Sequence, residues 1–168
     1  MKHLLLVCLL IMTLTACQQH SSGLQVGDAM PSVALTNFQG NAVKLPDEFK
    51  GKVTLIHFWS IDCHFCDKEV LIALEPLYAK YKPQGFIPIA INASPIKPND
   101  ERLKRFEKLT YPLLVDEYGL IAKQFGVIGL PTTFVFDSAG VLREKVTGEA
   151  GMEEYEKRLI TVLSGRSL

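Results

Sequence analysis

The chain has 168 residues, a length that suits one domain with a substantial buried core. It carries 18 lysine and arginine residues against 18 aspartate and glutamate residues, so its formal net charge is zero. This balance gives no indication of the strongly basic surface that binding to nucleic acid, or a polybasic contact with a membrane, requires. Hydrophobic residues make up 48% of the chain, and the N-terminus supplies much of the excess over an ordinary soluble domain.

The N-terminus predicts an export signal. A short basic start is followed by an apolar run from Leu4 to Leu14. A membrane span needs about 20 residues, so this run fits the hydrophobic region of a signal peptide better. Leu14-Thr15-Ala16-Cys17 then resembles the lipobox of bacterial lipoproteins, whose cysteine carries lipid. We expect a signal peptide over 1–16, a tether over 17–24 with lipidated Cys17, and one domain over 25–168. The alternative is an ordinary signal peptide with a coincidental cysteine.

The first half of the domain alternates strands and helices. Two short strands are expected over Val33–Leu45, around a turn, and a strand covered on both faces over Val53–Trp59. A helix is expected from about Cys63 to Tyr81, with a kink or break at Pro76. The next strand is expected over Phe86–Asn92, and its Pro88 predicts an edge or a bulge.

The second half predicts two more helices, a hairpin and a closing helix. The helices are expected over 99–109 and 118–125, the second ending at Gly126. The hairpin joins strands over 132–136 and 141–147, and the last helix covers 152–163. This order of elements predicts an α/β fold in which a mixed sheet has helices on both faces.

Two cysteines remain for chemistry within the domain. Cys8 lies in the signal peptide and Cys17 at the lipidation site, which leaves Cys63 and Cys66 where a buried strand turns into a helix. A helix N-terminus carries unpaired amide hydrogens and a partial positive charge, and both stabilise a thiolate. The thiolate is the nucleophile in disulfide exchange. Cys63 is the expected exposed nucleophile, and Cys66, beneath Phe65, the expected buried resolving thiol.

Zinc sites use the same cysteine spacing, so a metal site is the competing interpretation of the pair. A structural zinc ion needs a second pair of ligands. His3 and His20 lie outside the domain, His57 lies within a strand with no ligand motif beside it, and His64 stands between the cysteines. We therefore expect no metal, and no cofactor other than the Cys63–Cys66 disulfide.

The motifs resemble the TlpA/ResA/DsbE branch of the thioredoxin superfamily. Phe58-Trp59 precedes the cysteine pair, Glu69 follows Cys66 by three residues, and Gly129-Leu130-Pro131-Thr132-Thr133-Phe134 lies downstream. The resemblance covers about 26–163. It implies a thioredoxin fold with an N-terminal β-hairpin extension. It also implies an extracytoplasmic, membrane-tethered thiol–disulfide oxidoreductase, often a reductant of apocytochrome or other cysteine-bearing proteins.

The resemblance also suggests roles for residues around the cysteines. Pro131 matches the family's cis-proline, which offers backbone to a substrate strand, and we expect Leu130 and Trp59 to bind substrate beside it. Glu69 matches an acidic residue near the dithiol. His57 stands six residues before Cys63, where thioredoxins have a buried aspartate, and is expected to accept the Cys66 proton, alone or with Glu69. The simpler interpretations are that Trp59 and His57 are core residues and Glu69 a solvated carboxylate.

Two residues beside the cysteines depart from the family pattern. Asp62 stands where thioredoxins commonly have tryptophan, and His64 where many relatives have glycine, proline or glutamate. A carboxylate directly before Cys63 disfavours the thiolate, whereas a protonated His64 favours it.

The expected partners are client proteins with cysteines or disulfides and a membrane thiol–disulfide electron donor, with no nucleic acid. The expected location is the periplasmic side of a bacterial membrane. Gln18 replaces the aspartate that commonly marks inner-membrane retention, which favours the outer membrane in a host with two. Three alternatives stay open: a disulfide oxidase or isomerase, a peroxiredoxin-like peroxidase and a cysteine-based metal carrier. Ile56 and Ser60 stand where a peroxiredoxin has proline and threonine, which argues against the peroxidase.

Overall fold

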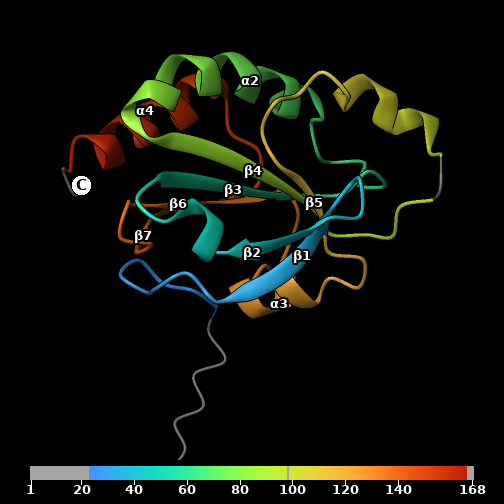
Figure 1. Cartoon of the computed structure of the whole chain (residues 1–168), viewed down its shortest axis with the longest axis horizontal. Coiled ribbons are helices and arrows are strands. Elements are labelled where there is room, and N and C mark those ends of the chain that lie inside the picture. The colour runs from blue at the N-terminus through green and yellow to red at the C-terminus, as the bar shows by residue number, and fades with distance from the viewer. Residues whose placement is uncertain (1–22, 98, 166–168) are drawn as a thin grey trace, which may run out of the picture.

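The computed structural model describes residues 23–97 and 99–165 (Figure 1). The expected signal peptide, Cys17 and most of the tether lie outside these residues. In the part described, no helix is long and apolar enough to cross a membrane.

One seven-stranded sheet forms the centre of the molecule, in the order β2-β1-β5-β4-β3-β6-β7 (Figure 1). The neighbours β3–β4 and β4–β5 are parallel, and every other neighbouring pair is antiparallel. The strands are β1 (Val33–Asn37), β2 (Ala42–Leu45), β3 (Val53–Trp59), β4 (Phe86–Asn92), β5 (Leu113–Val115), β6 (Thr132–Phe136) and β7 (Leu142–Thr147).

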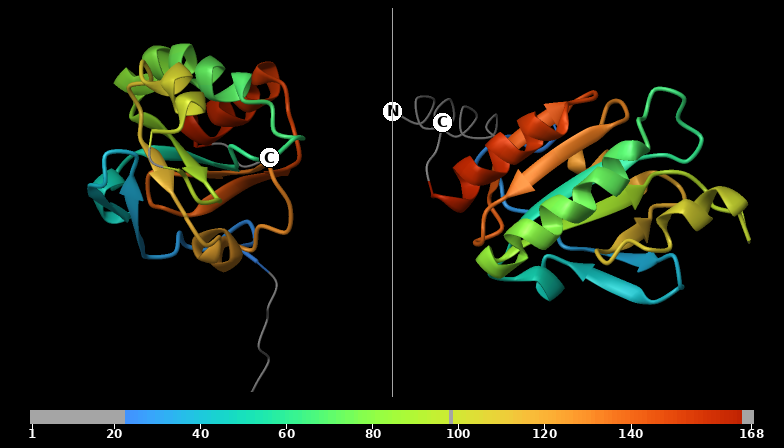
Figure 2. Two further views of the ribbon diagram at one scale, coloured as in Figure 1. Left: turned by 90° about the vertical axis from the view of Figure 1, so that its right-hand side faces the viewer. Right: turned by 90° about the horizontal axis from the view of Figure 1, so that it is seen from above.

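Helices cover both faces of this sheet. Helices α2 (Glu69–Tyr81) and α4 (Met152–Leu163) lie on one face and α3 (Leu120–Phe125) on the other, as Figure 2 shows. The described residues also form three 3-10 helices, η1 (Asp47–Phe49), η2 (Lys82–Gln84) and η3 (Glu101–Phe106). This arrangement confirms the thioredoxin fold, and β1 and β2 are the predicted N-terminal hairpin.

Strand β3 is the core of the domain because both of its faces are covered. All seven of its residues are buried. On one side Phe58 packs against Phe125 of α3, with ring centroids 5.2 Å apart, and on the other Trp59 packs edge-on against Phe106, at 5.4 Å. The rigid strand therefore fixes the position of the segment that follows it, which carries the two cysteines.

The predicted helix start at Cys63 is wrong, since α2 begins at Glu69 and residues 61–68 form turns. A helix through Cys63 would pair its carbonyl with the amide of Asp67. Here that carbonyl accepts from the ammonium of Lys68, and the Asp67 amide donates to Glu149 at 2.6 Å. Both helix-forming groups are thus occupied by side chains. The helix then runs through Pro76 without a break.

The interpretation of Pro88 as an edge or bulge is also wrong, because β4 lies inside the sheet between β5 and β3. Proline is accommodated there because β5 is short and pairs only with residues 90–92 of β4. The Ala90 amide donates toward the β5 side, to the Pro112 carbonyl. Position 88 faces the same side two residues earlier, where β5 has not begun, so no ladder bond is lost.

Two predicted helices are shorter than expected. The segment expected over 99–109 is the 3-10 helix η3, whose N-terminus is capped by the Asp100 side chain through the amide of Arg102. Helix α3 begins at Leu120, two residues late, because Gly119 has a positive φ of 66° that cannot continue a helix. Its predicted end at Gly126 is confirmed, with a φ of 72°.

Candidate active site

The two cysteines of the domain form a disulfide in the turn between β3 and α2. Their Cα atoms are 5.4 Å apart. Cys66 is buried, with 5% of its surface exposed, whereas Cys63 is only partly buried. This difference matches the roles expected for a nucleophile and a resolving thiol. The expected cover over Cys66 is wrong, however, because Phe65 is 86% exposed and points into solvent.

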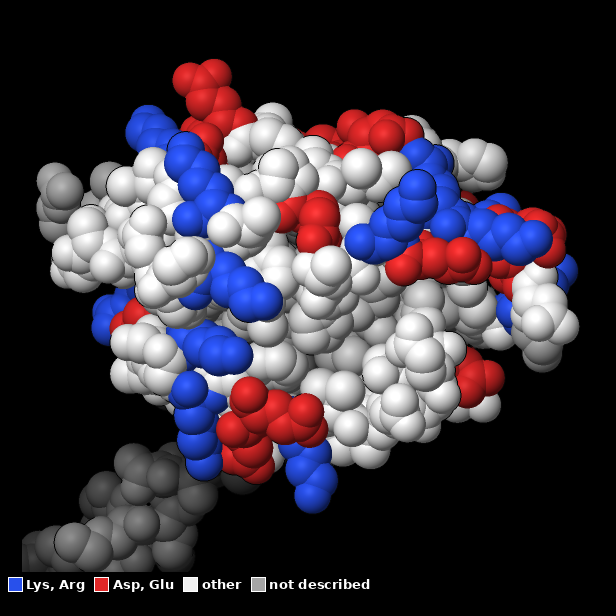
Figure 3. Space-filling view, turned by 45° about the horizontal axis from the view of Figure 1, so that its top comes forward, with Lys and Arg blue, Asp and Glu red and all other residues white. Residues whose placement is uncertain are grey.

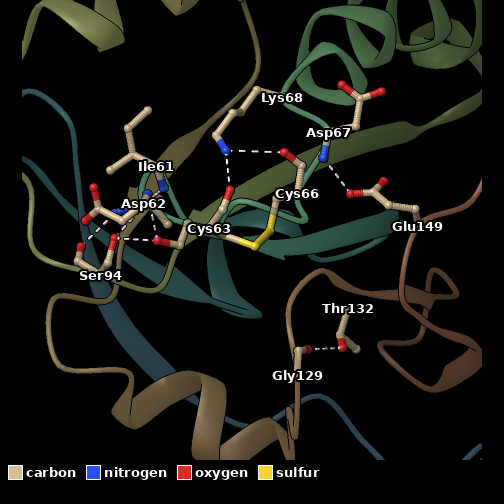
Figure 4. Close-up of a disulfide and its surroundings, with 12 residues drawn as sticks. Ile61, Asp62, Cys63, Cys66, Asp67, Lys68, Ser94, Gly129, Thr132 and Glu149 are labelled. Carbon is tan, nitrogen blue, oxygen red and sulfur yellow. Dashed lines mark hydrogen bonds between the residues drawn. A yellow bond between two sulfur atoms is a disulfide. The ribbon is translucent and has the colours of Figure 1, made fainter.

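Side chains hold the cysteine turn in place, as Figure 4 shows. The Lys68 ammonium donates to the carbonyl of Cys63 and, at 3.3 Å, to that of Cys66. Glu149, in the segment between β7 and α4, accepts the Asp67 amide at 2.6 Å. A cation and a carboxylate therefore brace the backbone on both sides of the buried sulfur.

The segment that enters the turn is fixed by the neighbouring strand β4. The amide of Ile61 donates to Oδ1 of Asn92 at 2.8 Å, and the amide of Asp62 donates to Oγ of Ser60 at 3.1 Å. Asn92 is fully buried. These bonds satisfy backbone groups that no strand or helix pairs, so the approach to Cys63 has one defined path.

The segment that contains Pro131 lies at the same end of the central strands as the cysteines. Thr132 at the start of β6 pairs with Phe58 near the end of β3, which places Pro131 beside the segment leading to Cys63. The Leu130–Pro131 bond is cis, which confirms the expectation from the family. The hydroxyl of Thr132 closes the turn by donating to the Gly129 carbonyl at 2.7 Å (Figure 4).

A buried polar group lies within β3, six residues before Cys63. His57 is 1% exposed, and its Nδ1 is 2.8 Å from Oγ1 of Thr133, which donates to the Tyr155 hydroxyl at 3.2 Å. When Thr133 gives its hydroxyl proton to Tyr155, it can accept from Nδ1–H, and in that tautomer the lone pair of the imidazole lies on Nε2. Within the part of the chain described, Nε2 has no hydrogen-bond partner. Burial lowers the pKa of His57 to about 4, so the imidazole is neutral at pH 7.

Comparison with known proteins shows the family to which this chain belongs. The family model named Redoxin matches residues 25–161, most of the chain. The chain belongs to the Redoxin family.

Relatives of this Redoxin protein indicate its chemistry. It is 36% identical over 139 residues to thiol-disulfide oxidoreductase ResA of Bacillus thuringiensis subsp. konkukian, covering 81% of this chain and 78% of the relative. It is 31% identical over 137 residues to ResA of Geobacillus kaustophilus, covering 82% and 78%. Among solved structures, a candidate thiol:disulfide interchange protein DsbE from Chlorobium tepidum superposes with a TM-score of 0.74 at 28% identity, covering 84% and 99%.

These matches confirm the predicted TlpA/ResA/DsbE-type protein. The Redoxin chain is a thiol–disulfide oxidoreductase, and its clients are proteins that contain cysteine. The dithiol turn and the cis-proline lie at the same end of the β3–β6 pair.

Two residues predicted for the Redoxin site have side chains that contact other partners. Trp59 is 0% exposed and packs in the core, so direct contact with a client is ruled out in this structure. Its size suits the space between β3 and η3, which is the simpler interpretation of a large aromatic in a buried strand. Glu69 is the first residue of α2, and its carboxylate, 66% exposed, pairs with Arg105. Its carboxylate is thus engaged by a cation from η3.

Sequence reasoning missed the side chains that hold the turn. Lys68, Glu149 and Asn92 belong to no motif, and Glu149 follows its partner Asp67 by 82 residues. Only the folded sheet brings such pairs together. Among the residues described, no group of three or more histidine, cysteine, aspartate or glutamate side chains is arranged to hold a metal ion.

Proposed function

We propose that this protein reduces disulfides in client proteins outside the cytoplasm, apocytochrome c among them, through Cys63 and Cys66. The observation that carries the proposal is the unequal burial of the two sulfurs at the cis-proline edge of the sheet. A client reaches only the partly exposed Cys63, while Cys66 stays enclosed until a mixed disulfide has formed.

Reduction of a client takes two exchange steps. The Cys63 thiolate attacks one sulfur of the client disulfide, a Cys63–client disulfide forms, and the other client sulfur leaves with the electron pair and takes up a proton. Cys66 then loses its proton and attacks the Cys63 sulfur. The Cys63–Cys66 disulfide forms and the client leaves as a dithiol, having gained two electrons and two protons. The pair supplies both electrons, so no further cofactor is required.

The second step needs a base, because a buried thiol holds its proton more tightly than the reference pKa of about 8.5. His57 is the base in this proposal. Its imidazole is neutral at pH 7, and Nε2, which has no hydrogen-bond partner in the described part of the chain, is the proposed acceptor. The negative charge of the thiolate formed on Cys66 would offset the low pKa of the buried ring. Glu69 is the less suitable candidate because its carboxylate pairs with Arg105.

The surface around Cys63 suits an extended client segment. Phe65 beside the cysteines is 86% exposed and Ile128 in the segment before the cis-proline is 94% exposed. In the proposal, the backbone of Leu130 and Pro131 aligns the client strand, and the two apolar side chains contact its flanks. Burial of such large apolar groups favours binding without requiring a particular client sequence.

A catalytic reductant must be reduced again after each turnover. We assign this step to a membrane thiol–disulfide electron donor that delivers two electrons to the Cys63–Cys66 disulfide. Lipid on Cys17 would keep the domain at the membrane where such a donor resides, on the periplasmic side. Gln18 after the lipidated cysteine favours the outer membrane where a host has two.

The reduction potential of the Cys63–Cys66 pair tests the direction of electron flow. We expect a value near that of thioredoxin, about −270 mV or lower, when the protein is equilibrated with dithiothreitol mixtures. A value near the roughly −120 mV of a strong oxidase would overturn the proposal in favour of disulfide formation. Peroxide consumption by the reduced protein, absent in the Cys63→Ser control, would instead indicate a peroxidase.

A further inference from the structure

Two carboxylates stand at the two ends of the cysteine segment, and both pair with arginines of one short element. Asp62 directly precedes Cys63, and its Oδ1 lies 2.8 Å from Nη1 of Arg102. Glu69, three residues after Cys66, pairs with Arg105. Both arginines belong to η3. On the right of Figure 3, the side of the molecule that carries η3, basic and acidic side chains lie against one another.

Arg102 does not owe its position to Asp62 alone. Its Nε lies 2.9 and 3.1 Å from the two carboxylate oxygens of Asp100, and its Nη2 lies 2.5 Å from Oδ2. The Asp100 side chain is only 7% exposed. Hydrogen bonds from the Arg102 side chain lower the pKa of Asp100 to about 2, so this pair persists at every pH at which thiols react. The guanidinium thus has one edge fixed on Asp100 and presents Nη1 to Asp62.

The ion pair between Asp62 and Arg102 explains how Cys63 can form a thiolate although a carboxylate directly precedes it. A free carboxylate next to Cys63 would repel the thiolate that has to form there. A guanidinium bonded to that carboxylate supplies the opposite charge at nearly the same place. The other charged or titratable groups around the turn are the Lys68 ammonium on the Cys63 carbonyl, Lys97 beside Asp62 and Asp100, the exposed His64, Asp67 on the Glu69 amide, and Glu149 on the Asp67 amide.

We propose that Arg102 is a positioning residue for the redox reaction: it holds and neutralises Asp62, and so allows Cys63 to ionise beside a carboxylate. The inference rests on the proposed function in one respect, that Cys63 acts as a thiolate nucleophile. It adds a residue from a different part of the chain, 40 positions after its partner, to the set that controls the reactivity of the cysteine.

The test is the pKa of Cys63 in the reduced full chain, from the pH dependence of its alkylation rate. Arg102→Gln should raise this pKa by about half a unit to one unit, since the Asp62 charge is then unopposed. Asp62→Asn added to Arg102→Gln should reverse the rise. Arg102→Lys, which keeps the charge, should stay within about 0.3 units of the natural protein. The rise should shrink as salt is added, because the groups are partly exposed.

Arg143→Gln is the matched control. Arg143 also pairs with an aspartate, Asp137, and is exposed to a similar degree, but it lies on β7, beside the end of β6 that is far from the cis-proline. It should leave the pKa of Cys63 unchanged. Both arginine side chains are about half exposed, and glutamine at position 102 keeps a hydrogen-bond donor for Asp100, so these variants should fold, which circular dichroism checks.

An unchanged pKa in Arg102→Gln, or a rise that Asp62→Asn does not reverse, would overturn the inference. No client takes part in this measurement. A failure here therefore leaves the direction of electron flow untouched, while an oxidase-like reduction potential would leave the role of Arg102 intact.

Discussion

Nδ1 of His57 lies 2.8 Å from Oγ1 of Thr133, a residue that follows it by 76 positions. Strand pairing explains the contact, since His57 of β3 and Thr133 of β6 face each other in the antiparallel register. The ring of Tyr155 from α4 stands edge-on to the imidazole, with centroids 6.3 Å apart. One nitrogen of the imidazole is thus hydrogen-bonded, and the other has no partner among the described residues, as the proposed role of proton acceptor requires.

If His57 accepts the Cys66 proton, its loss should slow only the step that needs a base. His57→Ala should slow resolution of a trapped mixed disulfide roughly 100-fold near pH 7. Near pH 9 the thiol ionises unaided and the rate should approach that of the natural protein. Stopped-flow measurement of client release at both pH values checks this.

The control for lost packing is Leu55→Ala, which truncates a fully buried residue of the same strand and keeps the base. The rate at which this variant resolves the mixed disulfide should change by the same factor at pH 7 and at pH 9. Equal slowing of His57→Ala at both pH values would make His57 a packing residue and leave Glu69 as the remaining candidate base.

The burial of His57 also predicts how stability depends on pH. Its folded pKa of about 4 lies below the unfolded value of 6.5, so the unfolded chain binds more protons between these values. Stability is therefore fully present above about pH 6.5 and is lost as the pH falls towards 4. Between pH 6.5 and 5, the free energy of unfolding from denaturant titration should fall by about 2 kcal/mol. His57→Gln should remove most of that slope, and an unchanged slope would show that the imidazole titrates normally.

The roles of the two cysteines predict unequal labelling. In the reduced protein at neutral pH, an alkylating reagent should modify Cys63 at least about tenfold faster than Cys66, because Cys66 is buried. Mass spectrometry of short labelling times measures both rates. In denaturant the difference should vanish. Faster labelling of Cys66 in the folded protein would reverse the assignment of nucleophile and resolving thiol.

Membrane attachment depends on Cys17 in this account. Cys17→Ser should release the protein from membranes in fractionated cells and leave the dithiol active. Cys8→Ser is the matched control, since Cys8 lies in the predicted signal peptide, and it should leave attachment unchanged. Membrane-bound protein after Cys17→Ser would show that another feature anchors the chain.

Much of the fold could be predicted from local patterns. Val53–Trp59 is a run of β-branched and aromatic residues, and 152–163 has helical periodicity, so both elements lie where expected. The start of α2 could not be predicted, because it depends on contacts that Lys68 and Glu149 make with the cysteine turn. The place of Pro88 likewise depends on the length of β5, which the local sequence does not contain.

In the candidate site, too, motifs predict some residues, whereas only the folded chain shows the surroundings of others. Cys63, Cys66 and Pro131 were found because their spacing and neighbours form motifs. The environment of Glu69 cannot be predicted from motifs, because its partner Arg105 lies 36 residues away in the sequence. Trp59 was assigned to client binding by resemblance, whereas its burial follows from its place in a strand covered on both faces.

The most direct test of the central claim is to trap the exchange intermediate. Reduced Cys66→Ser protein, mixed with a disulfide-bonded client peptide, should form a stable covalent complex through Cys63, and reductant should release it. Cys63→Ser protein should form almost none under the same conditions. Peptide mapping of the complex identifies the linked cysteine. A complex held by Cys66 in the Cys63→Ser variant, or no complex with either variant, would contradict exchange by a Cys63 nucleophile and a Cys66 resolving thiol.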